Sequence, residues 1–345
     1  MSIVIVKAKF IRNGLGLDHT DGVQKFHAAP TPRIGGVALF LGLLTSWVIA
    51  DGALKPLLGW TLLASFPAFI FGLVEDIFRN VGASKRLLAS FFAGILFCLL
   101  TGYSVDHLNL WWADAVVSIA FFSIVFTAFA IASAANAINI IDGFHGLSSG
   151  TILFILGAIG LVSWQVGDSL LFEMTLIAFS VVAGFFVVNF PFGKIFLGDG
   201  GAYLLGFIVA VLTVMLAERN DAVSPWVCPL ILSYPLTELV VSISRKIRRK
   251  GHHPGKPDNL HFHMLVHRAV LRRLPAHLKA EPIVHGITSI TLWILPAISL
   301  VLVSLTKFEA FYAIRYTLII FFIYLVFYTL LQFEDRRVGV KGTSE

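Results

Sequence analysis

Apolar residues in this chain gather in long blocks that short polar segments separate. A helix that crosses a lipid bilayer needs roughly 17 to 25 largely apolar residues. Ten blocks approach or reach this length: 34–50, 57–73, 87–102, 115–135, 151–166, 172–190, 201–217, 225–244, 284–305 and 311–331. The pattern predicts an all-α fold, a polytopic membrane helical bundle of about ten transmembrane helices, with residues 1–345 as one integral membrane domain.

The composition agrees with a membrane protein. Hydrophobic residues make up 57% of the chain and charged residues only 13%, whereas soluble domains carry about 25% charged residues. The two cysteines, Cys98 and Cys228, both fall inside apolar blocks. We therefore interpret them as small buried hydrophobic residues, with no disulfide framework or zinc cage.

The formal net charge of +6 could indicate a nucleic-acid partner, but its distribution follows membrane topology. If the N-terminus is cytoplasmic and the ten blocks alternate in direction, almost all of the 26 Lys and Arg residues lie on the cytoplasmic side. The exceptions are Lys55, Arg219, Lys307 and Arg315. Positive residues favour cytoplasmic loops, so we expect a multi-pass protein and no nucleic-acid partner.

Under this topology, every polar segment of chemical interest lies on the cytoplasmic side. These segments are "FGLVEDIFRN", the glycine-rich "NAINIIDGFHGLSSG", "FPFGKIFLGDGGAYLLGF" and "GHHPGKPDNLHFHMLVHRA". Acidic residues are costly near a bilayer and are usually functional there. Their gathering at one side predicts a shared site at the membrane surface.

Aspartates beside glycine-rich turns suit a divalent cation and phosphate groups. Mg²⁺ typically binds one or two carboxylates and takes its other ligands from water and substrate phosphates. Glycine lets backbone N–H groups approach phosphate oxygens, and a helix that starts after such a turn presents its positive end to an anion. Each segment alone is weak evidence for such a site. Their location on the same side of the membrane is stronger evidence.

The same segments resemble a known family. "KFHAAPTPRIGG", "GLVEDIFRNVGASKRLL", "NAINIIDGFHGLSSG", "FLGDGGAYLLGF" and "PDNLHFHMLVHR" are similar, in this order, to motifs of the polyprenyl-phosphate N-acetylhexosamine-1-phosphate transferases, glycosyltransferase family 4. The resemblance implies transfer of a sugar-1-phosphate from a UDP-N-acetylhexosamine to undecaprenyl phosphate with release of UMP. It implies Mg²⁺ as cofactor, with Mn²⁺ as the alternative ion, a bacterial inner-membrane location with a cytoplasmic active site, and allows a homodimer.

Residue roles follow from the resemblance, motif by motif. It implies Asp199 as the metal ligand, and Asp76, Glu75 and Asp142 as catalytic residues, with the acidic pair near the lipid phosphate. It implies substrate contacts from Asn139, His261, His263, Lys25 and Arg33.

Each of these residues also has a purely structural interpretation. Glu75 and Asp76 could cap a helix at the membrane interface, Asp142 could form an Asx turn, and Asp199 could cap the helix that follows it. Lys25 and Arg33 could serve topology alone.

Three departures from the family pattern bear on the prediction. Only "MSIVIV" precedes Lys7, where most relatives have a further span. His145 stands where many relatives have a second Asp, and the acidic pair is Glu-Asp rather than Asp-Asp. Together they favour the type that initiates O-antigen or common antigen over the peptidoglycan translocase branch.

Other functions stay open. The donor could carry GlcNAc, FucNAc or QuiNAc. A non-catalytic relative could bind lipid-linked precursors only. A membrane transporter should show acids near midspan and paired discontinuous helices, and neither is clear here. An intramembrane zinc protease is disfavoured because Met264, rather than Glu, follows His263 in the His263–His267 pair.

Overall fold

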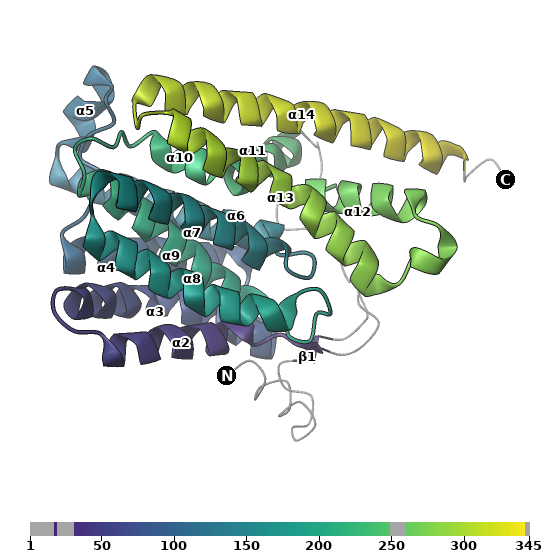
Figure 1. Ribbon diagram of the computed structural model, residues 1–345, viewed down its shortest axis with the longest axis horizontal. Helices are drawn as coiled ribbons and strands as arrows, with labels where there is room; N and C mark the ends of the chain where they lie inside the picture. The colour runs from purple at the N-terminus through teal and green to yellow at the C-terminus, as the bar shows by residue number, and fades with distance from the viewer. Residues whose placement is uncertain (1–16, 19–30, 249–259, 342–345) are drawn as a thin grey trace.

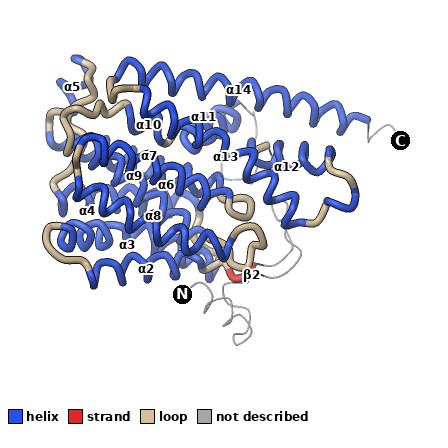
Figure 2. The backbone as a smooth tube through the Cα atoms, in the orientation of Figure 1, coloured by secondary structure: helices blue, strands red, loops and turns tan. Residues whose placement is uncertain are grey.

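The computed structural model describes residues 17–18, 31–248 and 260–341, and within these ranges the chain is almost entirely helical. One small antiparallel ribbon pairs β1 (Leu17–Asp18) with β2 (Thr31–Pro32), with Leu17 opposite Pro32. Figure 2 shows this ribbon at one end of a bundle of helices.

The helices follow the apolar blocks along the chain. They are α2 (Gly35–Ile49), α3 (Leu54–Phe78), α4 (Ala83–Thr101), α5 (Trp111–Val117), α6 (Ala120–Ile141), α7 (Leu147–Val166), α8 (Ser169–Asn189), α9 (Gly198–Glu218), α10 (Val227–Ile231), α11 (Ser233–Arg248), α12 (Phe262–Arg273), the 3₁₀ turn η1 (Ala276–Leu278), α13 (Glu281–Leu305) and α14 (Ala310–Lys341).

Eight helices of the described chain are long and apolar enough to cross a membrane, rather than the ten expected. They are α3, α4, α6, α7, α8, α9, α13 and α14. The block 34–50 forms α2, which has only 15 residues. The block 225–244 is divided at Leu232 into α10 and α11, close to Pro235, which lacks the N–H that a continuous helix would need.

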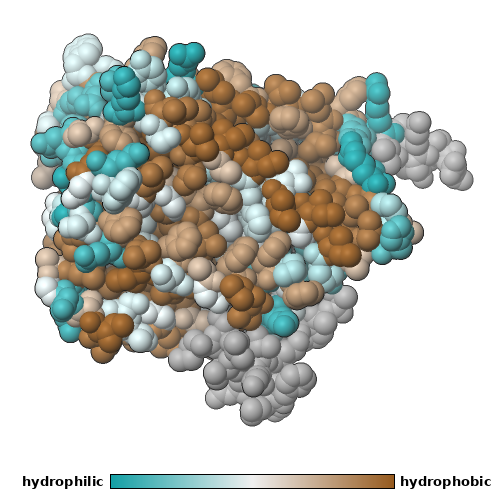
Figure 3. Space-filling model, in the orientation of Figure 1, coloured by the Kyte–Doolittle hydropathy of each residue, from teal (hydrophilic) through white to brown (hydrophobic). Residues whose placement is uncertain are grey.

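The chain is an integral membrane protein, and its surface agrees with this. Figure 3 shows hydrophobic side chains over a broad central region, with hydrophilic ones concentrated toward the two ends. Large apolar side chains such as Leu88, Phe129 and Val187 are exposed, with 64–75% of their surface free. Backbone groups in a bilayer must be satisfied internally, which a helical bundle achieves.

Helix α9 is the centre of the bundle. Every residue of α9 from Gly198 to Ala217 is buried, whereas the most apolar stretches of the other spans are only 17–67% buried. Glycines allow its neighbours to approach closely: a Cβ at Gly36 of α2 would lie 2.4 Å from the Gly201 nitrogen, and one at Gly72 of α3 would lie 2.6 Å from the Gly200 nitrogen. Small residues at helix interfaces permit such backbone contact, so the start of α9 is held against α2 and α3.

The polar segments gather at one end of the bundle, which we call the motif end. There α2, α4, α7, α9 and α13 begin, and α3, α6, α8 and α11 end. Helix α12 and the β-ribbon lie at the same end (Figure 1). The alternation of helix direction therefore brings loops that are distant in sequence to one surface.

Candidate functional site

Asp199 is the meeting point of a charged cluster at the motif end. It lies in the first turn of α9, after Gly198, whose φ of +73° suits glycine. One carboxylate oxygen accepts hydrogen bonds from the Asn139 amide (2.8 Å) and the Arg33 guanidinium (3.0 Å). The other oxygen accepts one from Arg86. Three helices and the segment before α2 thus converge on one buried carboxylate, which is 7% exposed.

Asp76 holds the start of α9 in place. It lies in the last turn of α3 and is 3% exposed. Its two carboxylate oxygens accept the backbone N–H groups of Asp199 and Gly200, both at 2.8 Å. The Arg33 Nε lies 3.1 Å from the same carboxylate. A negative group at a helix N-terminus satisfies free N–H groups and the positive helix end, so Asp76 positions Asp199 through the backbone.

Glu75 has a local role instead. Its carboxylate accepts the backbone N–H of Val81 at 2.7 Å. This contact closes the turn after α3, where Arg79 adopts a left-handed conformation with φ of 54°. The acidic pair of the sequence is therefore divided between Asp76, which faces α9, and Glu75, which shapes a loop.

Asp142 opens a tight turn that is shorter than the sequence suggested. The polar stretch 136–150 is mostly helical, because α6 continues to Ile141 and α7 begins at Leu147. Asn139 therefore projects from the last helical turn, and only residues 142–146 form the turn. Asp142 is half-buried, and burial raises its pKa to about 7 against the opposing effect of Arg33. A cation that approaches this carboxyl would favour its ionised form and so lower its pKa again.

Asn189 supports this turn from α8. Its side-chain oxygen accepts the Gly146 N–H at 2.7 Å, and its amide donates to the Ile195 carbonyl at 2.6 Å. Gly146 has a φ of +72°. Asn189 thus ties the turn to the segment that leads into α9.

The two histidines of the last motif lie beside the turn. The Nδ1 atom of His261 lies 2.8 Å from a carboxylate oxygen of Glu238, a fully buried residue of α11. The other oxygen of Glu238 accepts a hydrogen bond from the Tyr324 hydroxyl. The His263 ring stacks on that of His261, with centroids 5.4 Å apart. Its Nε2 is close to the turn, since a Cβ at Gly143 would lie 2.7 Å away. Burial lowers the pKa of His263 to about 3, so this imidazole is neutral at pH 7.

The structure thus brings together Asp199, Asp76, Asn139 and Arg33, and leaves Glu75 outside the cluster. Asp142 lies on the adjoining turn, with His261 and His263 beside that turn at the start of α12. Lys25 lies outside the described residues.

Three residues of the site were not singled out from the sequence. Arg86 follows the acidic pair in "SKRLL", and its charge was assigned to topology. Glu238 is an acid inside an apolar block. Acids in such blocks are usually paired with another side chain, so its position was a signal that it belongs to a site. Asn189 is a lone amide at the end of an apolar block, and only its contacts distinguish it from a capping residue.

The oxygen donors of the cluster suit a hard cation. Asp199, Asp142 and Asn139 offer carboxylate and amide oxygens, which are the ligands that Mg²⁺ prefers. Among the described residues, the groups of three His, Cys, Asp or Glu side chains with donor atoms within 4.8 Å are His145–Glu281–His285 and Asp106–His107–Glu218, and neither includes Asp199. Among the described residues, Asp199 therefore contributes to no three-residue group of this kind.

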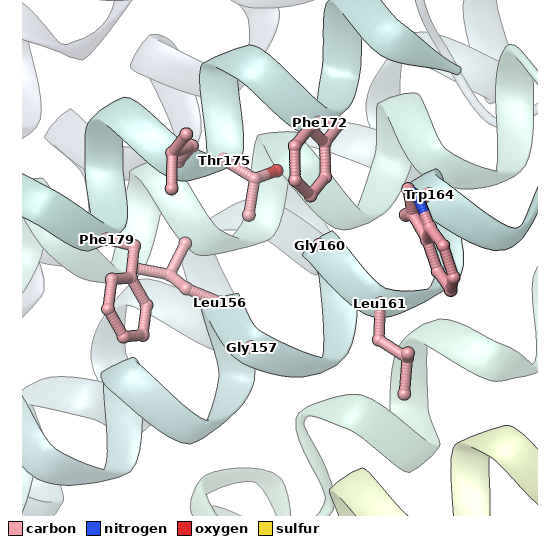
Figure 4. Close-up of a pocket in the computed structure, with 9 residues that line it drawn as sticks. Leu156, Gly157, Gly160, Leu161, Trp164, Phe172, Thr175 and Phe179 are labelled. Carbon is pink, nitrogen blue, oxygen red and sulfur yellow. The ribbon is translucent and has the colours of Figure 1, made fainter. Parts of the chain in front are cut away.

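A separate hollow of about 400 Å³ lies between α7 and α8, away from the charged cluster. Figure 4 shows Leu156, Trp164, Phe172 and Phe179 around it, with Thr175 as a polar neighbour. Its lining carries no charged group, so we do not include it in the candidate site.

Most residues of the charged cluster lie in a part of the chain that is similar to a known protein family. Residues 58–217 match the family model described as glycosyl transferase family 4. This range carries Asp76, Arg86, Asn139, Asp142 and Asp199.

Full-length relatives agree with this match. The chain is 27% identical over 261 residues to an undecaprenyl-phosphate alpha-N-acetylglucosaminyl 1-phosphate transferase of Yersinia pestis, covering 74% of this chain and 70% of that protein. It is 26% identical to the enzyme of the same name from Escherichia coli K12, covering 76% and 72%. It is 27% identical to a probable undecaprenyl-phosphate N-acetylglucosaminyl 1-phosphate transferase of Bacillus subtilis, covering 70% and 66%. Over residues 58–217 this chain is therefore similar to glycosyl transferase family 4.

Proposed function

We propose that this protein transfers a sugar-1-phosphate, most simply GlcNAc-1-phosphate, from a UDP-N-acetylhexosamine to undecaprenyl phosphate, as the first membrane step of a cell-surface polysaccharide. The observation that carries the proposal is the convergence of Arg33, Arg86 and Asn139 on Asp199, at the motif end of a chain whose relatives are named for this reaction. The motif end would face the cytoplasm, where UDP-sugars are made.

The reaction joins two anions. An oxygen of the lipid phosphate attacks the phosphorus that bears the sugar, the bond between that phosphorus and the bridging oxygen breaks, and UMP leaves with the bond electrons. The lipid phosphate is already largely ionised near pH 7, because its second pKa is about 6. A general base is therefore not required, and the protein's task is positioning and charge neutralisation.

The two arginines supply that neutralisation. Arg33 and Arg86 present guanidinium groups on either oxygen of Asp199. Planar guanidinium groups match phosphate oxygens well. Substrate phosphates would compete with Asp199 for these groups.

Mg²⁺ fits beside the same carboxylate. When bound, the ion would neutralise phosphate charge and favour departure of UMP. Asp199 would hold it, with Asn139 at the end of α6 and Asp142 on the following turn as candidate further oxygen donors. Mn²⁺ accepts the same donors.

Asp76 serves this site as a positioning residue in our proposal. Both of its oxygens are engaged by the α9 backbone and by Arg33. These contacts favour direct displacement by the lipid phosphate over a two-step route through an Asp76 nucleophile.

The test is UMP release by the purified full-length protein. It would receive undecaprenyl phosphate, Mg²⁺ and, in turn, the UDP derivatives of GlcNAc, FucNAc and QuiNAc. We expect Mg²⁺-dependent release with one donor and at least a hundredfold loss in Asp199→Asn, since electrostatic groups of this kind contribute about 10²–10³ in rate.

Asp221→Asn is the matched control, because Asp221 is an exposed aspartate far from the motif end in the chain's topology. It should retain normal release. If folded wild-type protein releases no UMP with any donor yet binds undecaprenyl phosphate, the binding-only alternative replaces the proposal.

A further inference from the structure

A group of side chains of the types that bind metal ions joins the Asp142 turn to the start of α13. His145 comes from the turn, and Glu281 and His285 come from the first turns of α13. One ligand atom from each lies within 4.8 Å of the other two. The two histidines are buried, with 4% and 3% of their surface exposed, and Glu281 is half-buried.

The ring orientation of His145 is fixed by the backbone. Its Nδ1 lies 3.0 Å from the carbonyl oxygen of Pro191. A carbonyl can only accept a hydrogen bond, so Nδ1 carries the proton and Nε2 is directed to the other side of the ring. Histidines that bind metals are commonly held in this way, with the second nitrogen donating to a carbonyl.

The distance between His145 and Glu281 fits two ligands of one ion. Nε2 lies 3.4 Å from the Glu281 carboxylate, which is longer than the usual N–H···O range of about 2.7–3.2 Å. Two ligands of tetrahedral zinc, each about 2.0–2.2 Å from the metal, are separated by about 3.4 Å. The separation therefore suits a shared cation better than a direct hydrogen bond.

Helix α13 presents the other two ligands on one face. Glu281 and His285 are four residues apart, which places them on successive turns of the same side. The same face continues with Ser289, whose hydroxyl donates to the His145 carbonyl at 2.8 Å. Trp293 follows, and its indole N–H donates to the Leu147 carbonyl at 3.2 Å. This face is thus built to hold the turn.

We propose that His145, Glu281 and His285 bind a zinc ion that fastens the start of α13 to the Asp142 turn. Two imidazoles and one carboxylate suit Zn²⁺, whereas Mg²⁺ prefers oxygen ligands alone. Three protein ligands leave a fourth position for water. The site is separate from the Asp199 cluster and does not depend on the proposed transfer reaction.

The test measures metal in the full-length protein, purified in detergent with a tag that lacks histidine. Every sample would carry His107→Ala, which removes a ligand from the Asp106–His107–Glu218 group. We expect one equivalent of zinc that is lost in His285→Gln and in His145→Gln. Glu281→Gln should weaken zinc binding at least tenfold, because even outer partners of metal ligands contribute about 10- to 100-fold.

Cobalt substitution gives a readout that needs no variant of these three residues. Co²⁺ in place of zinc should show the intense visible bands of tetrahedral coordination, and added Zn²⁺ should abolish them. His277→Gln, an exposed histidine of η1, should leave both readouts unchanged. Equal zinc content in wild type and the His285→Gln variant, or weak octahedral cobalt bands alone, would overturn the proposal and leave a direct contact between the His145 and Glu281 side chains.

Discussion

Arg33 connects the two acids of the charged cluster. Its Nε lies 3.1 Å from Asp76 and its Nη2 lies 3.0 Å from Asp199. A guanidinium can span two carboxylates because its donors form a rigid fork, which the single ammonium of lysine cannot do. The Asp76 carboxylate, in turn, has both oxygens engaged by the first amides of α9. At the residue scale, the carboxylate that caps α9 thus also belongs to the proposed site.

Asp76→Asn should therefore reduce stability as well as activity. The amide would keep one acceptor oxygen but direct an NH₂ group at a backbone N–H of α9. An unsatisfied buried donor costs about 1–3 kcal/mol, so we expect a lower melting temperature in detergent together with reduced UMP release. Glu75→Gln is the neighbouring control and should change UMP release much less. An Asp76→Asn protein of unchanged stability that is inactive would instead favour the nucleophile role.

At the element scale, the close packing of α3 on α9 keeps Asp76 in contact with the start of α9. Gly72 faces the backbone of Asp199 and Gly200, and a Cβ there would lie 2.6–2.7 Å from their atoms. Backbone atoms cannot turn aside as a flexible side chain can, so the helices would have to separate. Because Asp76 follows Gly72 by one turn, any separation also lengthens the contacts that fix Asp199.

Gly72→Ala is accordingly expected to abolish UMP release or prevent folding, although it adds one methyl group. Gly184→Ala provides the matched control, since a Cβ at Gly184 of α8 meets nothing within 4 Å. That change should be neutral or stabilise the helix by up to about 1 kcal/mol. The measurement is melting temperature and UMP release for both variants. Normal behaviour of Gly72→Ala would show that the α3–α9 contact can relax.

The whole molecule places its polar ends on opposite sides of the membrane. The motif end carries the charged cluster, α12 and η1, while the loop after α9 lies at the other end. The Lys and Arg pattern predicts that the motif end is cytoplasmic. Exposed positions at the two ends, Lys279 and Asp221, offer reporters of this orientation.

In intact cells, a membrane-impermeant maleimide should label Asp221→Cys, whereas Lys279→Cys should react only after lysis. Wild-type protein is the control for Cys98 and Cys228, which lie within the bundle. The reverse labelling pattern would contradict the cytoplasmic placement of the site.

Hydropathy located the helices well, because partition into lipid depends on composition over many residues. It could not locate the break at Leu232 or the continuation of α6 through Asn139, because a polar helix end resembles a loop in such a pattern. The meeting of Asp199, Asn139 and Arg33 could be expected from the alternation of helix direction. The contacts of Arg86 and Asn189 could not, because they depend on the rotation and register of packed helices.

The central position of α9 has a consequence for biosynthesis. Its neighbours α2, α3, α4, α6, α7 and α8 precede it along the chain, and the short α10 follows it. Chains are made from the N-terminus. Until residues 198–218 have been synthesised, the earlier helices therefore lack the helix that they pack around. A nascent chain that ends before this point lacks Asp199 and leaves Asp76 without the amides that it caps. Synthesis of α9 is therefore required for the charged cluster, because the helix that fills the bundle also carries Asp199, the acid that the arginines contact.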